Sequence, residues 1–84
     1  MKRKQKIVEI KVVPQENGAM LLDKHRGIYF QVNDVGLIVF KGLANNKSMQ
    51  ELVEEITVMF SIDRKQAEID VNLFLEQLKK EGFA

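Results

Sequence analysis

The chain has 84 residues, of which 45% are hydrophobic and 30% are charged, and its formal net charge is +1. This length suits one compact globular domain, because a second core would leave each half too little buried apolar surface. The chain has no cysteine, which excludes disulfides and thiolate metal sites, and its single histidine cannot build a metal centre alone. We therefore expect no metal and no cofactor.

No run of about 18 apolar residues is present, as a membrane span would require, and the basic N-terminus lacks an apolar h-region. We therefore expect a soluble cytoplasmic protein that does not bind membranes, and we expect a monomer. Residues 1 to 11 carry five Lys or Arg against Glu9, which is 5 minus 1, or +4, and leaves −3 for the rest. Such a segment can touch nucleic acid or a membrane surface, but more often it keeps a small domain soluble. We predict a flexible basic arm at residues 1–5 and one domain at residues 6–84.

Three strands are predicted first. The stretch KIVEIKVV, residues 6–13, alternates apolar and polar side chains with the period of two that a half-buried strand shows. GAMLLD, residues 18–23, is the second strand. IYFQV, residues 28–32, is the third and is rich in β-branched and aromatic residues. Short connections between them predict an antiparallel meander.

The connections carry turn residues. Pro14 cannot donate to a strand ladder, and Asn17 and Gly18 tolerate the positive φ of a hairpin. Asp23 opens the second turn, and we interpret His25, between Lys24 and Arg26, as a solvated turn residue.

Three helices follow. Asn33 or Asp34 can cap the first, which ends around Gly42 and the ANNK segment. Ser48 and Glu51 have the spacing of a capping box, so the second helix begins near Met49 and stops near Ser61. Its apolar stripe has five members: Leu52, Val53, Ile56, Met59 and Phe60.

Asp63 with Gln66 repeats the capping pattern, and the third helix runs from Arg64 until Gly82, which suits the left-handed position after a helix end. Its main apolar face consists of Ala67, Val71, Phe74, Leu75 and Leu78. Ile69 and Leu73 lie on a flank with Asp70 between the two faces. They suggest a second apolar surface, although a wide buried stripe explains them as well.

The order of three strands and three helices predicts an α+β domain, a winged helix-turn-helix with a three-stranded antiparallel sheet followed by three helices. Catalysis is not expected, because there is no cysteine, no glycine-rich phosphate loop and only His25, which nothing nearby orients.

A winged-helix DNA-binding transcriptional regulator is the alternative. Its third helix would read the DNA, but the four basic residues near that helix are offset by four acidic ones, and the second helix adds three glutamates. Attraction to phosphates supplies most of the non-specific affinity for DNA, so we expect no nucleic-acid partner.

Peptide or protein recognition remains. IYFQV has neither charge nor proline to blunt a sheet edge, so an extended peptide could pair with it, unless the third helix or the N-terminal arm covers that edge.

GIYFQVNDVGLIVF resembles the PqqD-like family, in which glycine, an aromatic pair, an aliphatic residue, Asn or Asp and a later glycine precede a short helix. The resemblance extends through GAMLLD, SMQELVEEI and AEIDVNLFLEQLKKEGF, from about Lys6 onward. It implies a RiPP recognition element, which binds the leader segment of a ribosomally made precursor peptide and presents it to modifying enzymes.

In that family the leader lies antiparallel to the third strand, in the groove between this strand and the third helix. The resemblance therefore implies these peptide-binding residues: Ile28, Tyr29, Phe30, Gln31, Val32, Ile69, Asp70 and Leu73. Tyr29 and Gln31 would point to one side of the sheet, and Asp70 would accept a hydrogen bond from a polar leader side chain. Implied partners are a leader peptidase and a cyclase, as in lasso peptide biosynthesis, or a radical enzyme, as in quinone cofactor formation. The lasso class is favoured for so short a free-standing chain, although no residue decides it.

Overall fold

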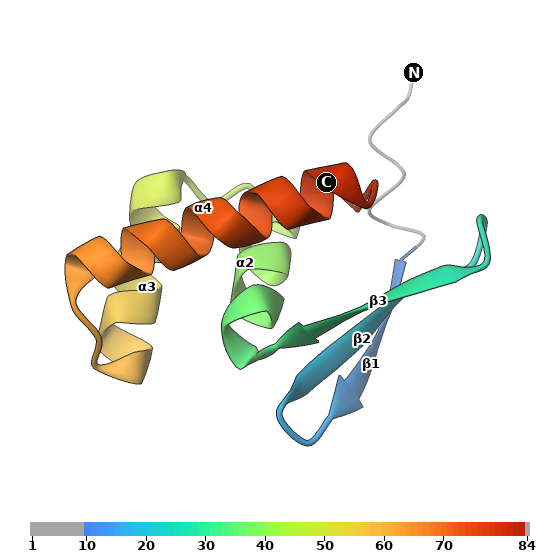
Figure 1. The fold of residues 1–84 in the computed structure, drawn as a ribbon, viewed down its shortest axis with the longest axis horizontal. Helices are drawn as coiled ribbons and strands as arrows, with labels where there is room; N and C mark the ends of the chain where they lie inside the picture. Colours follow the sequence, from blue (N-terminus) through green and yellow to red (C-terminus); the bar gives the residue numbers. More distant parts are fainter. Residues whose placement is uncertain (1–9, 84) are drawn as a thin grey trace.

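The computed structural model describes residues 10–83 as three antiparallel strands followed by three helices (Figure 1). The elements are β1 (Ile10–Gln15), β2 (Gly18–Asp23), β3 (Ile28–Asn33), α2 (Asp34–Ala44), α3 (Met49–Phe60) and α4 (Arg64–Lys80). The predicted α+β class and element order are confirmed, and the arrangement is compatible with a winged helix-turn-helix. The predicted arm at 1–5 and the predicted strand residues 6–9 lie outside the described residues.

The sheet has the order β1-β2-β3, so β2 is central. Leu21 of β2 is paired with Val12 on one side and Phe30 on the other. The first strand was predicted to end before Pro14, but it continues to Gln15. Proline is tolerated there because β1 is an edge strand, in which a backbone N–H that points away from β2 is not needed for pairing within the sheet. The hairpin closes at Gly18, where φ is +150° and a Cβ would collide with the carbonyl of Val32.

Side chains at the helix N-termini satisfy free amide groups. The Asn33 side chain accepts from the Gly36 amide at 2.9 Å, so Asn33 caps α2. At α3 the predicted capping box is confirmed, because Glu51 N–H donates to Ser48 Oγ at 3.1 Å and Ser48 N–H donates to Glu51 Oε1 at 2.7 Å.

The capping box predicted at the start of α4 does not form, although Asp63 caps the helix. Asp63 accepts from the Lys65 amide at 3.1 Å. The Gln66 side chain does not accept from the Asp63 amide; its amide nitrogen donates instead to Asp70 Oδ1, one turn further along, at 2.9 Å.

The C-terminal end of α4 is a Schellman motif. Phe83 N–H donates to the carbonyl of Leu78 at 2.7 Å, and Gly82 N–H donates to that of Lys79 at 3.0 Å. Gly82 has a φ of +80°, which confirms its predicted left-handed conformation. The motif turns the chain so that Phe83 is buried, with 2% of its surface exposed.

The core lies between one face of the sheet and the three helices. It contains Ile10, Ala19, Leu21, Val32, Val39, Phe40, Leu52, Val53, Ile56, Ala67, Val71, Leu78 and Phe83. In α3 the predicted stripe is wrong at Met59, which is 63% exposed. The first helix ends at Ala44, where the predicted ANNK segment begins, whereas Gly42 lies inside α2, where a Cβ would collide with Leu52.

Candidate functional site

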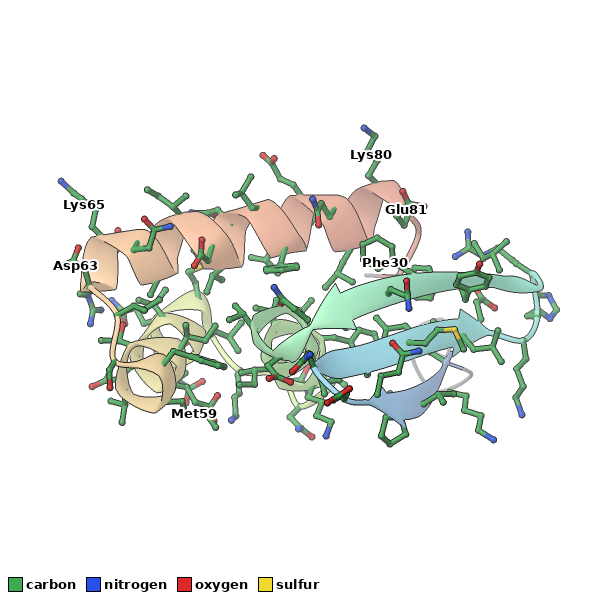
Figure 2. All side chains as sticks on the ribbon, turned by 60° about the horizontal axis from the view of Figure 1, so that its bottom comes forward. Phe30, Met59, Asp63, Lys65, Lys80 and Glu81 are labelled. Carbon is green, nitrogen blue, oxygen red and sulfur yellow. The ribbon has the colours of Figure 1, made fainter. Side chains whose placement is uncertain are left out.

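β3 is an edge strand, as strand addition would require. Among residues 10–83 no strand pairs with its outer edge, and its segment Ile28–Val32 carries no charge and no proline. Figure 2 shows α4 running above β3, with β2 and β1 on the opposite side of that strand. The free edge of β3 therefore faces the side of the molecule where α4 lies.

The side chains of β3 alternate between two environments. Val32 is 7% exposed and Phe30 is half-buried, so the side chains at positions 28, 30 and 32 face the helices. Ile28, at the start of the strand, is the most exposed of the three. Tyr29 is 65% exposed on the opposite face. Gln31 shares that face and donates from its side-chain amide to Gln15 Oε1 at 3.2 Å. The predicted division of the strand into two sides is confirmed.

Two aliphatic side chains of α4 are exposed. Ile69 and Leu73 have 50% and 52% of their surface accessible, whereas Ala67 and Val71 on the core face have none. A wide buried stripe therefore does not account for Ile69 and Leu73. Asp70 lies between them in sequence and is half-buried. Its Oδ1 atom accepts from Gln66, and Oδ2 has no hydrogen-bond partner within residues 10–83.

The separation of β3 and α4 depends on what lies between them. α2 packs on both elements, whereas the backbones of β3 and α4 come close to each other at few points. The Phe74 ring of α4 reaches the start of α2. A Cβ built on Gly36 would lie 2.7 Å from Cε1 of Phe74, and it would lie 3.0 Å from Cβ of Val32. Asp70 precedes Phe74 by four residues and shares its side of the helix. We call the free edge of β3 together with Ile69, Asp70 and Leu73 the strand–helix surface.

Two residues near one end of this surface were missed by sequence reasoning. Arg26 was given no role of its own, but its guanidinium donates to Asp23 Oδ2 at 2.7 Å and to the carbonyls of Glu81 and Gly82 at 3.0 and 3.1 Å. Phe83 stacks on Phe30, with ring centroids 5.8 Å apart. The available signal was the glycine followed by an apolar residue at a helix end, because the residue after a Schellman glycine often makes an apolar contact.

Asp23 does more than open the turn. Its side chain is buried, and Oδ1 accepts from the amides of His25 and Arg26 at 3.0 and 3.1 Å. The hydrogen bond from the Arg26 side chain lowers the pKa of the Asp23 carboxyl from its ordinary value, against the opposing effect of burial.

The charges around α4 are mixed in sign. A pocket at its N-terminal end is lined by Asp63, Arg64, Lys65 and Glu68, two acids and two bases. In the part of the chain that the structure describes, no cluster of three or more His, Cys, Asp or Glu is placed to hold a metal ion. No helix of that part has the length and apolar character that crossing a membrane would take.

Two solved structures are similar to this chain over most of its length. One is described as TbiB1 in complex with the TbiA(beta) leader peptide; it is 27% identical, with a TM-score of 0.75, and the match covers 89% of this chain and 87% of that one. The other is a lasso peptide synthetase B1 complexed with the leader peptide; it is 30% identical, with a TM-score of 0.74, and the match covers 88% and 87% of the two chains.

A comparison with curated proteins finds no significant match. The family model for coenzyme PQQ synthesis protein D (PqqD) matches residues 18–84, which is most of the domain and omits β1. The predicted resemblance is thereby confirmed, and this chain belongs to the PqqD family.

Proposed function

We propose that this protein is a RiPP recognition element that binds the leader segment of a ribosomally synthesised precursor peptide and presents it to modifying enzymes. The leader adds to the sheet as a fourth strand at the free edge of β3. The observation that carries this proposal is that the uncharged edge of β3 lies on the side of the molecule where α4 runs, and that α4 leaves two aliphatic residues exposed, Ile69 and Leu73.

Each part of the strand–helix surface has a physical role in this mechanism. Within residues 10–83, the outward amides and carbonyls of Ile28–Val32 have no partner strand, and pairing with them gives affinity without regard to side-chain identity. Leu73 and Ile69 present about half of their surface to solvent, and apolar leader side chains that cover it are removed from water. Asp70 Oδ2 is available to a donor on the leader, which adds selectivity.

Support comes from the family and from the two similar structures, both of which are complexes with leader peptides. One of these proteins is a lasso peptide synthetase B1, so we favour lasso peptide biosynthesis as the pathway class. The proposed partners are then a leader peptidase and a cyclase, with a radical enzyme as the alternative partner. In this role the protein binds peptide without catalysis and acts as a monomer in the cytoplasm.

The DNA-binding alternative receives no support from the structure. The charges on α4 are mixed, α3 carries Glu51, Glu54 and Glu55, and the two similar structures hold peptides. Such a surface offers little net attraction to phosphates.

The test is calorimetric titration of the full chain with the leader of the precursor encoded beside its gene. A leader of about 10 to 20 residues is long enough for one strand plus anchoring side chains. A scrambled peptide of the same composition is the control. We expect saturable binding of the native leader alone. The absence of heat and of NMR shift changes at high micromolar peptide would contradict the proposal, and tight sequence-selective DNA binding would replace it.

A further inference from the structure

The turn between β2 and β3 contacts the C-terminal cap of α4 through one side chain. Arg26 donates to the carbonyls of Glu81 and Gly82, which follow the last turn of that helix. Its guanidinium carbon lies 5.5 Å from the centroid of the Phe83 ring. One residue of the turn therefore holds three consecutive residues of the cap.

Arg26 is itself fixed from the sheet side. Its Nε donates to Asp23 Oδ2 at 2.7 Å, and the Asp23 side chain is only 5% exposed whereas that of Arg26 is 38% exposed. The other oxygen of Asp23 accepts two amides of the turn, one of which belongs to Arg26. The carboxylate therefore orients the guanidinium, so that its remaining donors point at the cap carbonyls.

The glycine in the cap makes this approach possible. A Cβ at Gly82 would lie 2.6 to 3.0 Å from the guanidinium atoms of Arg26. Phe83 then follows at the position where its ring both stacks on Phe30 of β3 and lies beneath Arg26. The cap is thus bound to the β3 strand and to the turn that precedes it.

β3 and α4 are therefore connected near both ends of the strand. At the α2 end, Phe74 of α4 closely approaches Gly36, which itself lies close to Val32 of β3. At the opposite end the cluster of Arg26, Phe83 and Phe30 links β3 and its preceding turn to the cap of α4. α4 is also held by α2, by α3 and by the core that Val71 and Leu78 share with the sheet. The cluster of Arg26, Phe83 and Phe30 adds a link at the cap end, where it bears on how α4 lies relative to the strand.

We propose that Arg26 is a positioning residue for leader binding, which presets the alignment of α4 with the free edge of β3 by tying the cap residues Glu81 and Gly82 to the β2–β3 turn. This inference rests on the proposed function. It adds that the strand–helix surface already has its binding geometry in the free protein, and that Arg26 acts without contacting the leader.

A positioning role has a kinetic signature. Loss of the Arg26 contacts would lower the fraction of free molecules in which α4 is correctly aligned. The apparent association constant for the leader falls in proportion to that fraction. The association rate falls with it, whereas the dissociation rate of the assembled complex does not change. A residue that contacts the leader directly acts mainly on the dissociation rate.

The experiment measures both rates by stopped-flow polarisation with the labelled leader of the neighbouring precursor. The variants are Arg26→Ala and Arg26→Lys, and Lys24→Ala is the matched control, because Lys24 is an exposed cation in the same turn without a described hydrogen bond or ion pair. We expect Arg26→Ala to associate about tenfold more slowly, with a dissociation rate within twofold of the original. Arg26→Lys should lie between, since an ammonium cannot reproduce the planar fork, and Lys24→Ala should match the original chain.

Amide hydrogen exchange of the free protein gives a readout without leader. Exchange at Gly82 and Phe83 should accelerate in Arg26→Ala, while the core strand β2 keeps its protection. If Arg26→Ala does not fold, Arg26→Lys and Arg26→Gln carry both measurements.

Three results would overturn the inference. Unchanged association in folded Arg26 variants shows that the tie does not matter for binding. A raised dissociation rate with unchanged association makes Arg26 a contact residue. Failure of the original chain to bind leader removes the proposed function itself, and that result is obtained without any Arg26 variant.

Discussion

The ring of Phe30 stacks on the ring of Phe83, with centroids 5.8 Å apart and planes inclined by 29°. Phe30 belongs to the edge strand, and Phe83 lies beyond the last turn of α4, so this contact joins the sheet to the end of the chain. Phe83 is 2% exposed, which makes it a core residue despite its terminal position.

Replacing Phe83 should therefore destabilise the fold. Phe83→Ala removes a buried aromatic ring and leaves a cavity, so we expect a loss of about 3 to 5 kcal/mol in the free energy of unfolding. Tyr29→Ala is the control, because Tyr29 is 65% exposed and its loss should change stability by less than about 0.5 kcal/mol. Urea denaturation measures both. Similar midpoints for Phe83→Ala and the original chain would show that the C-terminal residues are dispensable.

Gly36 is predicted to resist substitution although it lies inside a helix. Alanine normally stabilises a helix interior by up to about 1 kcal/mol relative to glycine. Here a Cβ would lie 2.7 Å from the Phe74 ring, so we expect Gly36→Ala to cost about 1 to 3 kcal/mol instead. Adding Phe74→Leu provides room, and a double-mutant cycle should show favourable coupling of at least about 0.5 kcal/mol. A Gly36→Ala protein more stable than the original would refute the close approach.

Leu73 and Leu78 should separate binding from stability. Leu73 is 52% exposed and Leu78 is fully buried, although both lie on α4. Leu73→Ala should weaken leader binding by about 1 to 3 kcal/mol if it is an anchor, with little loss of stability. Leu78→Ala should cost about 2 to 5 kcal/mol of stability. Calorimetry at a temperature where both variants are folded makes the comparison, and equal leader affinity of Leu73→Ala and the original chain would remove Leu73 from the site.

Stability should depend on pH through Asp23. The pKa of this carboxyl is lowered in the folded protein from 3.8, so the folded state favours the ionised form. Its contribution is fully present above pH 3.8 and is lost as the pH falls through the lowered pKa of the folded state. We expect the original chain to lose more stability than Asp23→Asn on acidification below about pH 4. Thermal melts at pH 7, 4 and 3 test this, and parallel losses in the two proteins would contradict it.

Interactions between neighbours in sequence were the ones most readily predicted. The capping box of Ser48 and Glu51 is confirmed because both partners lie within one helical turn and have no competitor. Asp63 and Gln66 have the same spacing, but Asp70 one turn further along offers Gln66 another partner. Local pattern therefore predicts which bonds are possible, and the other partners within reach of a side chain decide how it is oriented and which bond forms.

Contacts between distant segments were not predictable in the same way. Nothing near Arg26 in sequence indicates that Gly82 will offer it a carbonyl, since that proximity exists only after β3 and α4 have packed around α2. Met59 fits the apolar period of α3 but is 63% exposed, because periodicity gives the face of a helix and not how far the neighbouring elements extend over it. For the strand–helix surface, the period-two pattern predicted which side chains of β3 share a face, and the exposure of Ile69 and Leu73 required the structure.

The free edge of β3 offers the most direct test of strand addition. In an antiparallel strand the amides point alternately toward the paired neighbour and away from it. A proline at an outward position keeps the pairing with β2, removes one donor from the free edge and places its ring where the leader backbone would lie. A proline at an inward position removes a ladder bond to β2 instead. Tyr29→Pro, Phe30→Pro and Gln31→Pro made in parallel therefore sample both kinds of position.

We expect one parity to give folded protein that no longer binds the leader and the other to give unfolded or strongly destabilised protein. One lost hydrogen bond is worth only about 0.5 to 1.5 kcal/mol net, so most of the binding loss should come from the steric block. Circular dichroism establishes which variants are folded, and leader titration follows on those alone. Tyr29→Ala, Phe30→Ala and Gln31→Ala are the matched controls, because they remove the same side chains, including the Phe30 ring that stacks on Phe83, and leave the backbone donor in place. If a folded proline variant binds the leader as tightly as the original chain, the leader does not pair with β3, and the exposed aliphatic residues of α4 would have to bind it by another geometry.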